Sequence, residues 1–437
     1  MIIYKNSVII TTENSTSKYY INCLNSLRAI AIIIIIISHS INLTFSLDLG
    51  NPFYYSMGAF GVALFTFLSG NLLTRNIVIK QGSNHSWLEW YKKRIIRIIP
   101  LLILSTIFIL FYKFFVFKEE YNLNLILIHM SGLQSIPTNP NNLLIMGPHW
   151  YITFILSCYL VFPVLYYFLN KRIKLTIRIG IIIYLFFIVF HGFFYYGIEY
   201  LFSEILHIYF KINFFRGYFP MYFIFFFGMM LGYNLGRDHE YVKNIFNIKI
   251  KKKAVYILLL FIFCLLSLIL GIIYEFPIFS DFSYLCSLIL LPLITIFLTI
   301  VFMIYLDNKN KFNNILNILG THSYEVFLIH LVPISMLALL KIELELYFIY
   351  LPIAILISII LSHPFYFFGK WISRNKRIHV IVITFSSSLI IYSLIIYVLQ
   401  LQTSFNDLGA FLLFFTILSI MIEIMLLKRY SFKSYKT

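Results

Sequence analysis

The hydrophobic pattern of the chain consists of long apolar runs separated by short polar stretches. A bilayer core needs roughly 20 apolar residues for each spanning helix. About twelve segments meet this length, at 24–45, 56–74, 98–117, 149–169, 175–194, 218–235, 254–273, 284–305, 322–340, 346–368, 379–400 and 408–427. The pattern therefore predicts an all-α fold, a polytopic transmembrane bundle of about twelve spanning helices.

Charged residues between these segments alternate in sign along the chain. Lys and Arg gather in stretches 75–97, 171–174, 237–253, 309–311, 370–377 and 428–436, and the intervening loops hold most of the acidic residues. Short cytoplasmic loops carry an excess of Lys and Arg. The alternation therefore predicts that both termini are cytoplasmic. The longest polar stretch, 118–148, is expected to be an external loop or cap.

Composition narrows the class of protein. Of the 437 residues, 61% are hydrophobic and only 12% are charged, which excludes an ordinary soluble domain. A net charge of +17 would suggest a nucleic-acid partner in a soluble protein. Here the basic residues lie in clusters between apolar runs, so the expected partner is the lipid bilayer and not nucleic acid. The four cysteines lack metal-ligand spacing. We expect packing thiols and no metal.

Arg28 and His39 are two ionisable residues inside the first apolar run. They are eleven positions apart, which on a helix places the side chains about 20° apart around the axis and about 16 Å apart along it. Ionisable side chains at membrane depth are costly and are functional candidates. In the alternative interpretation Arg28 reaches the inner interface and His39 bonds a neighbouring helix.

Five motifs occur along the first nine predicted helices. They are LNSLRAIAIIIIIISH with Arg28 and His39, GAFGVALFTFLSGNLLT with Ser69, YKKRIIRIIP with Arg94 and Arg97, PHWYITFILSCYLVFP with Trp150, and LGTHSYEVFLIH with Tyr324 and His330. In this order the set resembles the acyltransferase-3 family of integral membrane O-acyltransferases.

The resemblance implies a domain division and an activity. A ten-helix acyltransferase-like domain would cover 24–369, after a cytoplasmic segment at 1–23 and before two further helices and a basic tail at 370–437. The enzyme would transfer an acyl group, with acetyl expected, from acyl-CoA to a hydroxyl of a cell-surface or lipid-linked carbohydrate. It would act in polysaccharide biosynthesis at the cytoplasmic (inner) membrane of a bacterium. Acetyl-CoA would be a substrate, and no permanently bound cofactor is expected.

The resemblance also assigns residues to roles. His39 and Arg28 would be catalytic, with His39 either a general base or the carrier of a transient acyl group. Arg94 and Arg97 would bind the phosphates of the donor, or they would serve only as positive-inside anchors. Ser69, Trp150, Tyr324 and His330 would contact substrate or donor. Each of three has an alternative role. Ser69 could serve helix packing, Trp150 could anchor the helix at the membrane interface, and His330 could be a structural histidine.

One departure from the family pattern affects the expected acceptor. Many members have a Glu five residues after the Trp of the fourth helix, whereas this chain has Ile155. This substitution resembles the branch that acts on exopolysaccharides and related glycans. Two other functions stay open: a flippase for a lipid-linked glycan, and a relative that binds ligand without catalysis. Internal repeats, which transporters often contain, are not evident.

Overall fold

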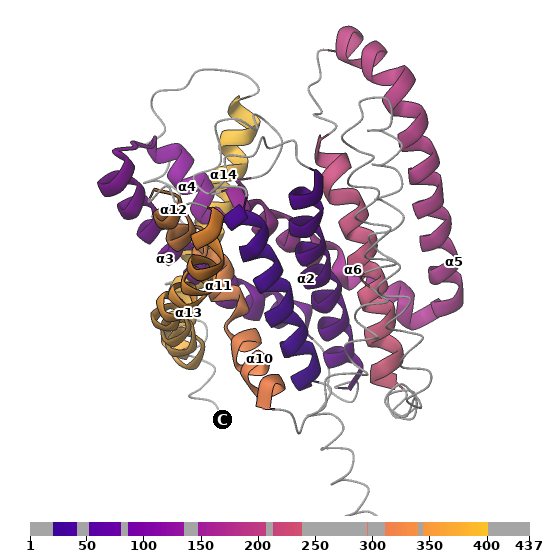
Figure 1. The fold of residues 1–437 in the computed structure, drawn as a ribbon. Helices are drawn as coiled ribbons and strands as arrows, with labels where there is room; N and C mark the ends of the chain where they lie inside the picture. The colour runs from indigo at the N-terminus through magenta and orange to yellow at the C-terminus, as the bar shows by residue number, and fades with distance from the viewer. Residues whose placement is uncertain are drawn as a thin grey trace, which may run out of the picture. The chain divides into compact units, whose positions relative to one another are not determined.

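The computed structural model describes residues 21–41, 52–79, 86–134, 147–206, 213–237, 295, 311–339 and 344–400. Helices are the regular structure throughout these ranges, with no strand among them, so the predicted all-α class is confirmed (Figure 1). The predicted spans at 254–273 and 408–427, the predicted span at 284–305 apart from Thr295, and residues 1–20 lie outside the described residues.

The described helices have the following bounds. They are Ile21–Ile41, α2 (Pro52–Ile79), α3 (Trp87–Phe117), α4 (Leu123–Ser131), the 3₁₀ turn η1 (Gly147–His149), α5 (Trp150–Leu206), α6 (Asn213–Arg237), α10 (Lys311–Thr321), α11 (Ser323–Ile329), α12 (Leu331–Leu339), α13 (Leu344–Arg374) and α14 (Lys376–Gln400).

Within the described ranges, five helices are long and apolar enough to cross a membrane. They are Ile21–Ile41, Gly58–Ile79, Trp87–Phe117, Gly147–Ile183 and Ile349–Arg374, and a bent pair formed by Asn314–Thr321 and Ser323–Leu339 would make a sixth. The chain is therefore a multi-pass membrane protein. The count of twelve spans and the cytoplasmic placement of the termini stay predictions.

The chain divides into two compact units. The first unit holds residues 1–84 and 160–360, and the second holds 85–159 and 361–437. In the first unit α2 and α6 approach so closely that only glycine fits between them. A Cβ atom at Gly70 would lie 2.2 Å from the carbonyl oxygen of Phe225, and one at Gly228 would lie 2.1 Å from that of Phe67. Small residues let membrane helices approach in this way.

Helix Ile21–Ile41 packs against the same core. Its buried side chains Cys23, Leu24 and Leu27 share an apolar cluster with Leu64 of α2, Leu235 of α6 and Leu316 of α10. The Asn25 side chain donates a hydrogen bond of 3.0 Å to Asn317 of α10. This contact ties the first helix to the segment that carries the fifth motif.

The second unit is built from α3, α4, α14 and parts of α5 and α13. Ser86 caps α3, and its hydroxyl accepts a hydrogen bond from the backbone N–H of Glu89 at 3.4 Å. Tyr392 of α14 donates to Asn124 of α4 at 2.7 Å. The short α4 ends at Gly132, whose φ of 79° lies in the left-handed region that favours glycine.

Several helix ends differ from those predicted. Helix α2 runs on to Ile79 and α3 begins at Trp87, so Arg75, Arg94 and Arg97 are helical residues and not loop residues. Helix α5 joins the predicted fourth and fifth spans across a non-helical residue, Arg172, with φ −145° and ψ 61°. Arg and Lys are good helix formers. Hydropathy therefore marks the apolar part of a helix and not its ends.

Candidate functional site

The fifth motif forms a broken span in the first unit. Helix α10 ends at Thr321, His322 has non-helical dihedrals of φ −100° and ψ 4°, and the two segments meet at a bend of 60°. Just before the bend, only glycine fits at position 320, because a Cβ atom there would lie 1.7 Å from the backbone oxygen of Asn25 in the first helix. The bend leads into α11, whose last residue, Ile329, is followed by His330.

His39 of the first helix lies against His330. The two ring centroids are 5.3 Å apart and the planes are tilted by 38°. His330 is 1% exposed, whereas His39 is half-buried. Two residues that sequence comparison placed in separate motifs therefore meet in one contact.

The tautomer of His330 follows from its backbone contact. Its Nδ1 lies 2.8 Å from the carbonyl oxygen of Phe327. A carbonyl oxygen can only accept, so Nδ1 carries the hydrogen, and the lone pair of the neutral ring lies on Nε2. The ring of Phe327 lies 5.8 Å from His330, and Phe65 of α2 packs edge-on against Phe327 at 6.5 Å. These contacts hold the His330 ring in one orientation.

His39 is less constrained. Among the described residues its ring nitrogens form no hydrogen bond, and its one ring contact is with His330. The buried neighbour Ser40 uses its hydroxyl locally, on the carbonyl oxygen of Ile37 at 2.9 Å. Arg28 is half-buried in the same uninterrupted helix. The continuity of this helix preserves the rise and rotation that predicted a shared face for Arg28 and His39.

Arg94 and Arg97 lie in the second unit, in the first half of α3. The Arg94 guanidinium lies 4.9 Å from the ring centroid of Trp90, which itself contacts Tyr159 edge-on at 5.9 Å. Arg94 is half-buried and its Nε has no acceptor in the part of the chain that the structure describes, whereas Arg97 is exposed.

Within the described residues, the two arginines of this part of α3 have no acidic partner. Glu89, in the first turn of the helix, pairs with Lys92 at 2.8 Å. Neither Arg94 nor Arg97 forms an ion pair within the described ranges. The result is a site with unmatched positive charge and an unsatisfied donor, which suits an anion.

Comparison with known proteins was made against families, curated proteins and solved structures. Residues 21–366 match the model of the acyltransferase-3 family, which is described as an acyltransferase domain. The chain belongs to the acyltransferase-3 family. This match confirms the resemblance drawn from the five motifs. No curated protein and no solved structure matches the chain.

Other predicted site residues of this acyltransferase are spread over both units. In the first unit Ser69 of α2 and Tyr324 of α11 are half-buried. In the second, Trp150 begins α5 and contacts Tyr151 and Phe154, with ring centroids 6.1 and 6.5 Å away. Ile155 is buried. An apolar side chain therefore occupies the position where many family members have a carboxylate.

Three buried ionisable residues of the acyltransferase were missed by sequence reasoning. Glu325 and His322 lie at the bend of the broken span, and Arg75 lies in α2 at 3% exposure. A buried charge is costly unless it is paired. Glu325 could have been noticed, because it is an acidic residue inside an apolar motif. Arg75 was assigned to a loop because it follows the apolar part of its helix.

A second histidine pair lies in the second unit. His129 of α4 and His149 of η1 are fully buried, and Nε2 of His129 lies 2.8 Å from Nδ1 of His149. Gln134 donates to the backbone oxygen of His149, and Thr153 donates to that of Gly132 at 2.7 Å. Burial, with smaller effects from His149 and Lys113, holds the pKa of His129 well below its usual value. Sequence reasoning gave His129 no role, since only the fold brings this pair together.

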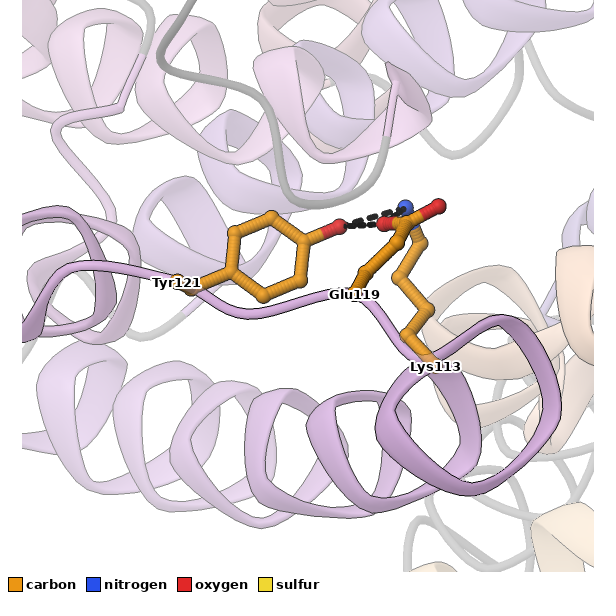
Figure 2. Close-up of polar contacts among 3 residues, drawn as sticks. All are labelled: Lys113, Glu119 and Tyr121. Atoms are coloured by element: carbon orange, nitrogen blue, oxygen red, sulfur yellow. Dashed lines mark hydrogen bonds and ion pairs between the residues drawn. The ribbon is translucent and has the colours of Figure 1, made fainter.

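A partly exposed polar cluster fastens the end of α3 to the segment before α4. Figure 2 shows Lys113 donating to Glu119 at 3.0 Å and to the Tyr121 hydroxyl at 2.8 Å, while that hydroxyl donates to the same carboxylate. The hydrogen bond from Tyr121 lowers the pKa of Glu119, and burial raises the pKa of Tyr121. The predicted external loop thus begins with an ordered structure.

Metal chemistry has no candidate ligand set in the part of the chain that the structure describes. No group of three or more His, Cys, Asp or Glu residues is placed to hold an ion there. Cys23 and Cys158 are buried free thiols.

Proposed function

We propose that this acyltransferase transfers an acetyl group from cytoplasmic acetyl-CoA to a hydroxyl of a cell-surface or lipid-linked carbohydrate. One observation carries the proposal. Inside an acyltransferase-3 domain, the first helix holds His39, which makes no hydrogen bond among the described residues, against the oriented ring of His330. We place the enzyme in the cytoplasmic membrane of a bacterium, with about twelve spans and both termini inside.

The proposed chemistry uses His39 as a general base. Its neutral ring takes the proton of the acceptor hydroxyl while that oxygen attacks the thioester carbonyl. The C–S bond then breaks, and the protonated ring returns the proton to the departing thiolate. The products are an O-acyl carbohydrate and CoA. A variant of this route passes through an acyl group on His39, and it differs by one covalent intermediate.

His330 is proposed as a positioning residue. Its Nδ1–H is engaged by the Phe327 carbonyl, so it can act on His39 or on the acceptor only through Nε2 or its ring face. Arg28 is proposed to orient the substrate along the same helix face. Ser69, Tyr324 and Trp150 are proposed contacts to donor or acceptor.

Arg94 and Arg97 are proposed to bind the phosphates of acyl-CoA. Support comes from the absence of ion pairs to either arginine and of an acceptor for the Arg94 Nε among the described residues, and from the cation–π contact of Arg94 with Trp90. This contact restrains the guanidinium, whose planar fork matches phosphate oxygens. An arginine that only anchored the helix would need neither feature.

The experiment for this function compares surface glycans from cells with and without the protein by NMR. We expect the O-acyl signals to disappear while the polymer remains. Purified protein should also transfer label from radiolabelled acetyl-CoA to the glycan. Loss of the polymer itself, with no transfer in vitro, would contradict the enzyme and support the flippase. Family membership favours the enzyme.

A further inference from the structure

A cavity of about 620 Å³ lies at the turn between α13 and α14, within the second unit. Its lining consists of Phe367, Lys370, Trp371, Arg374, Asn375 and Lys376. None of these residues belongs to the proposed acyl-transfer chemistry. The volume is in the range of small-molecule sites, which is roughly 300–1,000 Å³.

The lining is strongly positive. Lys370, Arg374 and Lys376 contribute three cations, and the lining contains no carboxylate. Within the described residues none of the three forms an ion pair, and the one aromatic contact of Lys370 is with Tyr366 at 5.6 Å. Clustered cations with no counter-charge favour an anionic ligand.

The geometry of the turn suits a phosphate group in particular. A guanidinium binds phosphate through two parallel hydrogen bonds, and the two ammonium groups add charge without strict geometry. The 25-residue helix α14 begins at Lys376, so the positive end of its dipole faces the same region. Asn375 marks the turn, and its backbone N–H donates to the carbonyl oxygens of Trp371 and Ile372 at 3.2 and 3.1 Å.

The aromatic residues indicate where the phosphate comes from. Phe367 is 60% exposed and Trp371 is 54% exposed. The candidate span Ile349–Arg374 ends at this cavity. Exposed Trp and cations at the end of a span are typical of the membrane interface, the depth at which lipid phosphates lie.

We propose that this cavity binds the phosphate headgroup of an anionic membrane lipid. The three cations contact the phosphate, while Phe367 and Trp371 lie beside the upper acyl chains. A soluble phosphate compound, including acyl-CoA, shares the same charge chemistry. The test therefore separates the two sources.

The experiment measures the unfolding temperature of the purified full chain in neutral detergent. Phosphatidylglycerol, phosphatidylcholine, inorganic phosphate and CoA are added separately. The test variant combines Lys370→Gln, Arg374→Gln and Lys376→Gln. The control combines Arg172→Gln, Lys174→Gln and Arg178→Gln, which removes the same charge from exposed positions of α5.

We expect phosphatidylglycerol to stabilise the parent and the control, and to bind the test variant at least about tenfold more weakly. Phosphatidylcholine should have no effect. Equal stabilisation of the test variant overturns the site. Protection by inorganic phosphate or CoA, with none by phosphatidylglycerol, overturns the lipid as the source.

A second measurement uses only the parent protein and is decisive even if the triple variant fails to fold. A photoreactive phosphatidylglycerol is cross-linked to the chain and the labelled peptides are identified by mass spectrometry. Labelling within 367–376 supports the site, and labelling confined to other segments overturns it.

Discussion

The two histidine pairs of this acyltransferase have similar geometry and very different surroundings. In the first unit His39 and His330 are 5.3 Å apart and tilted by 38°, and in the second unit His129 and His149 are 5.0 Å apart and tilted by 39°. The second pair is fully buried and joined by a hydrogen bond of 2.8 Å. In the first pair His39 is half-buried and forms no hydrogen bond among the described residues.

This difference shows what separates a reactive histidine candidate from a structural one. A sealed ring whose nitrogen is engaged by another side chain cannot exchange a proton with a substrate. A ring that is partly open, with its nitrogens uncommitted, can do so, provided that its neighbour fixes its orientation. We therefore base the proposal of His39 as the reactive histidine on hydrogen bonding and access, and not on ring proximity alone.

The largest expected effect is the loss of acyl transfer on changing His39. His39→Gln keeps hydrogen-bonding capacity but cannot accept a proton near neutral pH, so O-acylation of the glycan should fall by about a hundredfold or more. NMR of the glycan from cells expressing the variant provides the measurement. His363→Gln, at an exposed position of α13, is the matched control and should behave like the parent. Equal membrane insertion of all three proteins must be shown first.

Substituting Arg94 or Arg97 tests whether the second unit binds the donor in addition to supporting the fold. Removing a charge-assisted phosphate contact costs about 1.5–3 kcal/mol, so Arg94→Ala or Arg97→Ala should raise the apparent requirement for acetyl-CoA by roughly 10-fold to 150-fold. Initial rates of the purified enzyme over a range of donor concentrations measure this. Lys174→Ala, at an exposed position of α5 outside this cluster, should change it little. If both arginine variants depend on donor concentration as the parent does, Arg94 and Arg97 only anchor the helix at the membrane interface.

His330 should show a smaller effect that depends on which nitrogen is replaced. His330→Asn keeps a donor near Nδ1, where it can reach the Phe327 carbonyl, and His330→Gln places its amide nearer to Nε2. If Nε2 orients His39 or the acceptor, Asn should lower kcat by about tenfold, in line with the loss of one hydrogen bond, and Gln should retain more activity. The opposite ranking would assign His330 to helix packing alone.

The smallest expected effect is the pH dependence of stability that comes from the His129–His149 pair. Because the pKa of His129 in the folded protein lies below its usual value of 6.5, the unfolded chain binds more protons in the window just below pH 6.5. Stability should be complete above this window and should decline as the pH falls through it. The unfolding temperature of the parent should therefore be lower at about pH 5.5 than at about pH 7.5, by roughly 2–4 °C for each kcal/mol lost.

His129→Gln is the variant that isolates this contribution. Gln can replace a hydrogen bond to His149 but does not titrate, so the variant should lose part of the pH dependence. Glu119 does not interfere. Its pKa is lowered from 4.5, and its contribution is therefore constant above that pH. An unchanged pH dependence in His129→Gln would mean that other groups control acid stability.

Much of the fold could be predicted from the sequence, because apolar runs of membrane length report directly on helices. Helix ends could not, since Arg75, Arg94 and Arg97 extend helices beyond their apolar parts. The break at His322 was also missed. It lies beside the close contact between Gly320 and the Asn25 backbone, which is a tertiary feature.

The candidate site was predicted as residues but not as an arrangement. His39 and His330 were selected from separate motifs, and no periodicity in one helix could show that their rings meet. His149 lies in the fourth motif, directly before Trp150, but His129 had no local signal. The pairing of the two depends on burial and on a hydrogen bond between distant segments. Composition and spacing thus identify the ionisable side chains that lie in apolar segments. Packing determines which of them lie close together and which a substrate could reach.

The most direct test of the central claim measures two properties on the same three preparations: the parent, His39→Gln and His129→Gln, each purified in the same detergent. The rate of acyl transfer from radiolabelled acetyl-CoA and the unfolding temperature are determined for each. We expect His39→Gln to lose at least about a hundredfold in rate with a parental unfolding temperature, whereas His129→Gln should unfold at a different temperature and keep most of its rate when assayed in the cold. A folded His39→Gln protein that transfers acyl groups at the parental rate would contradict this expectation.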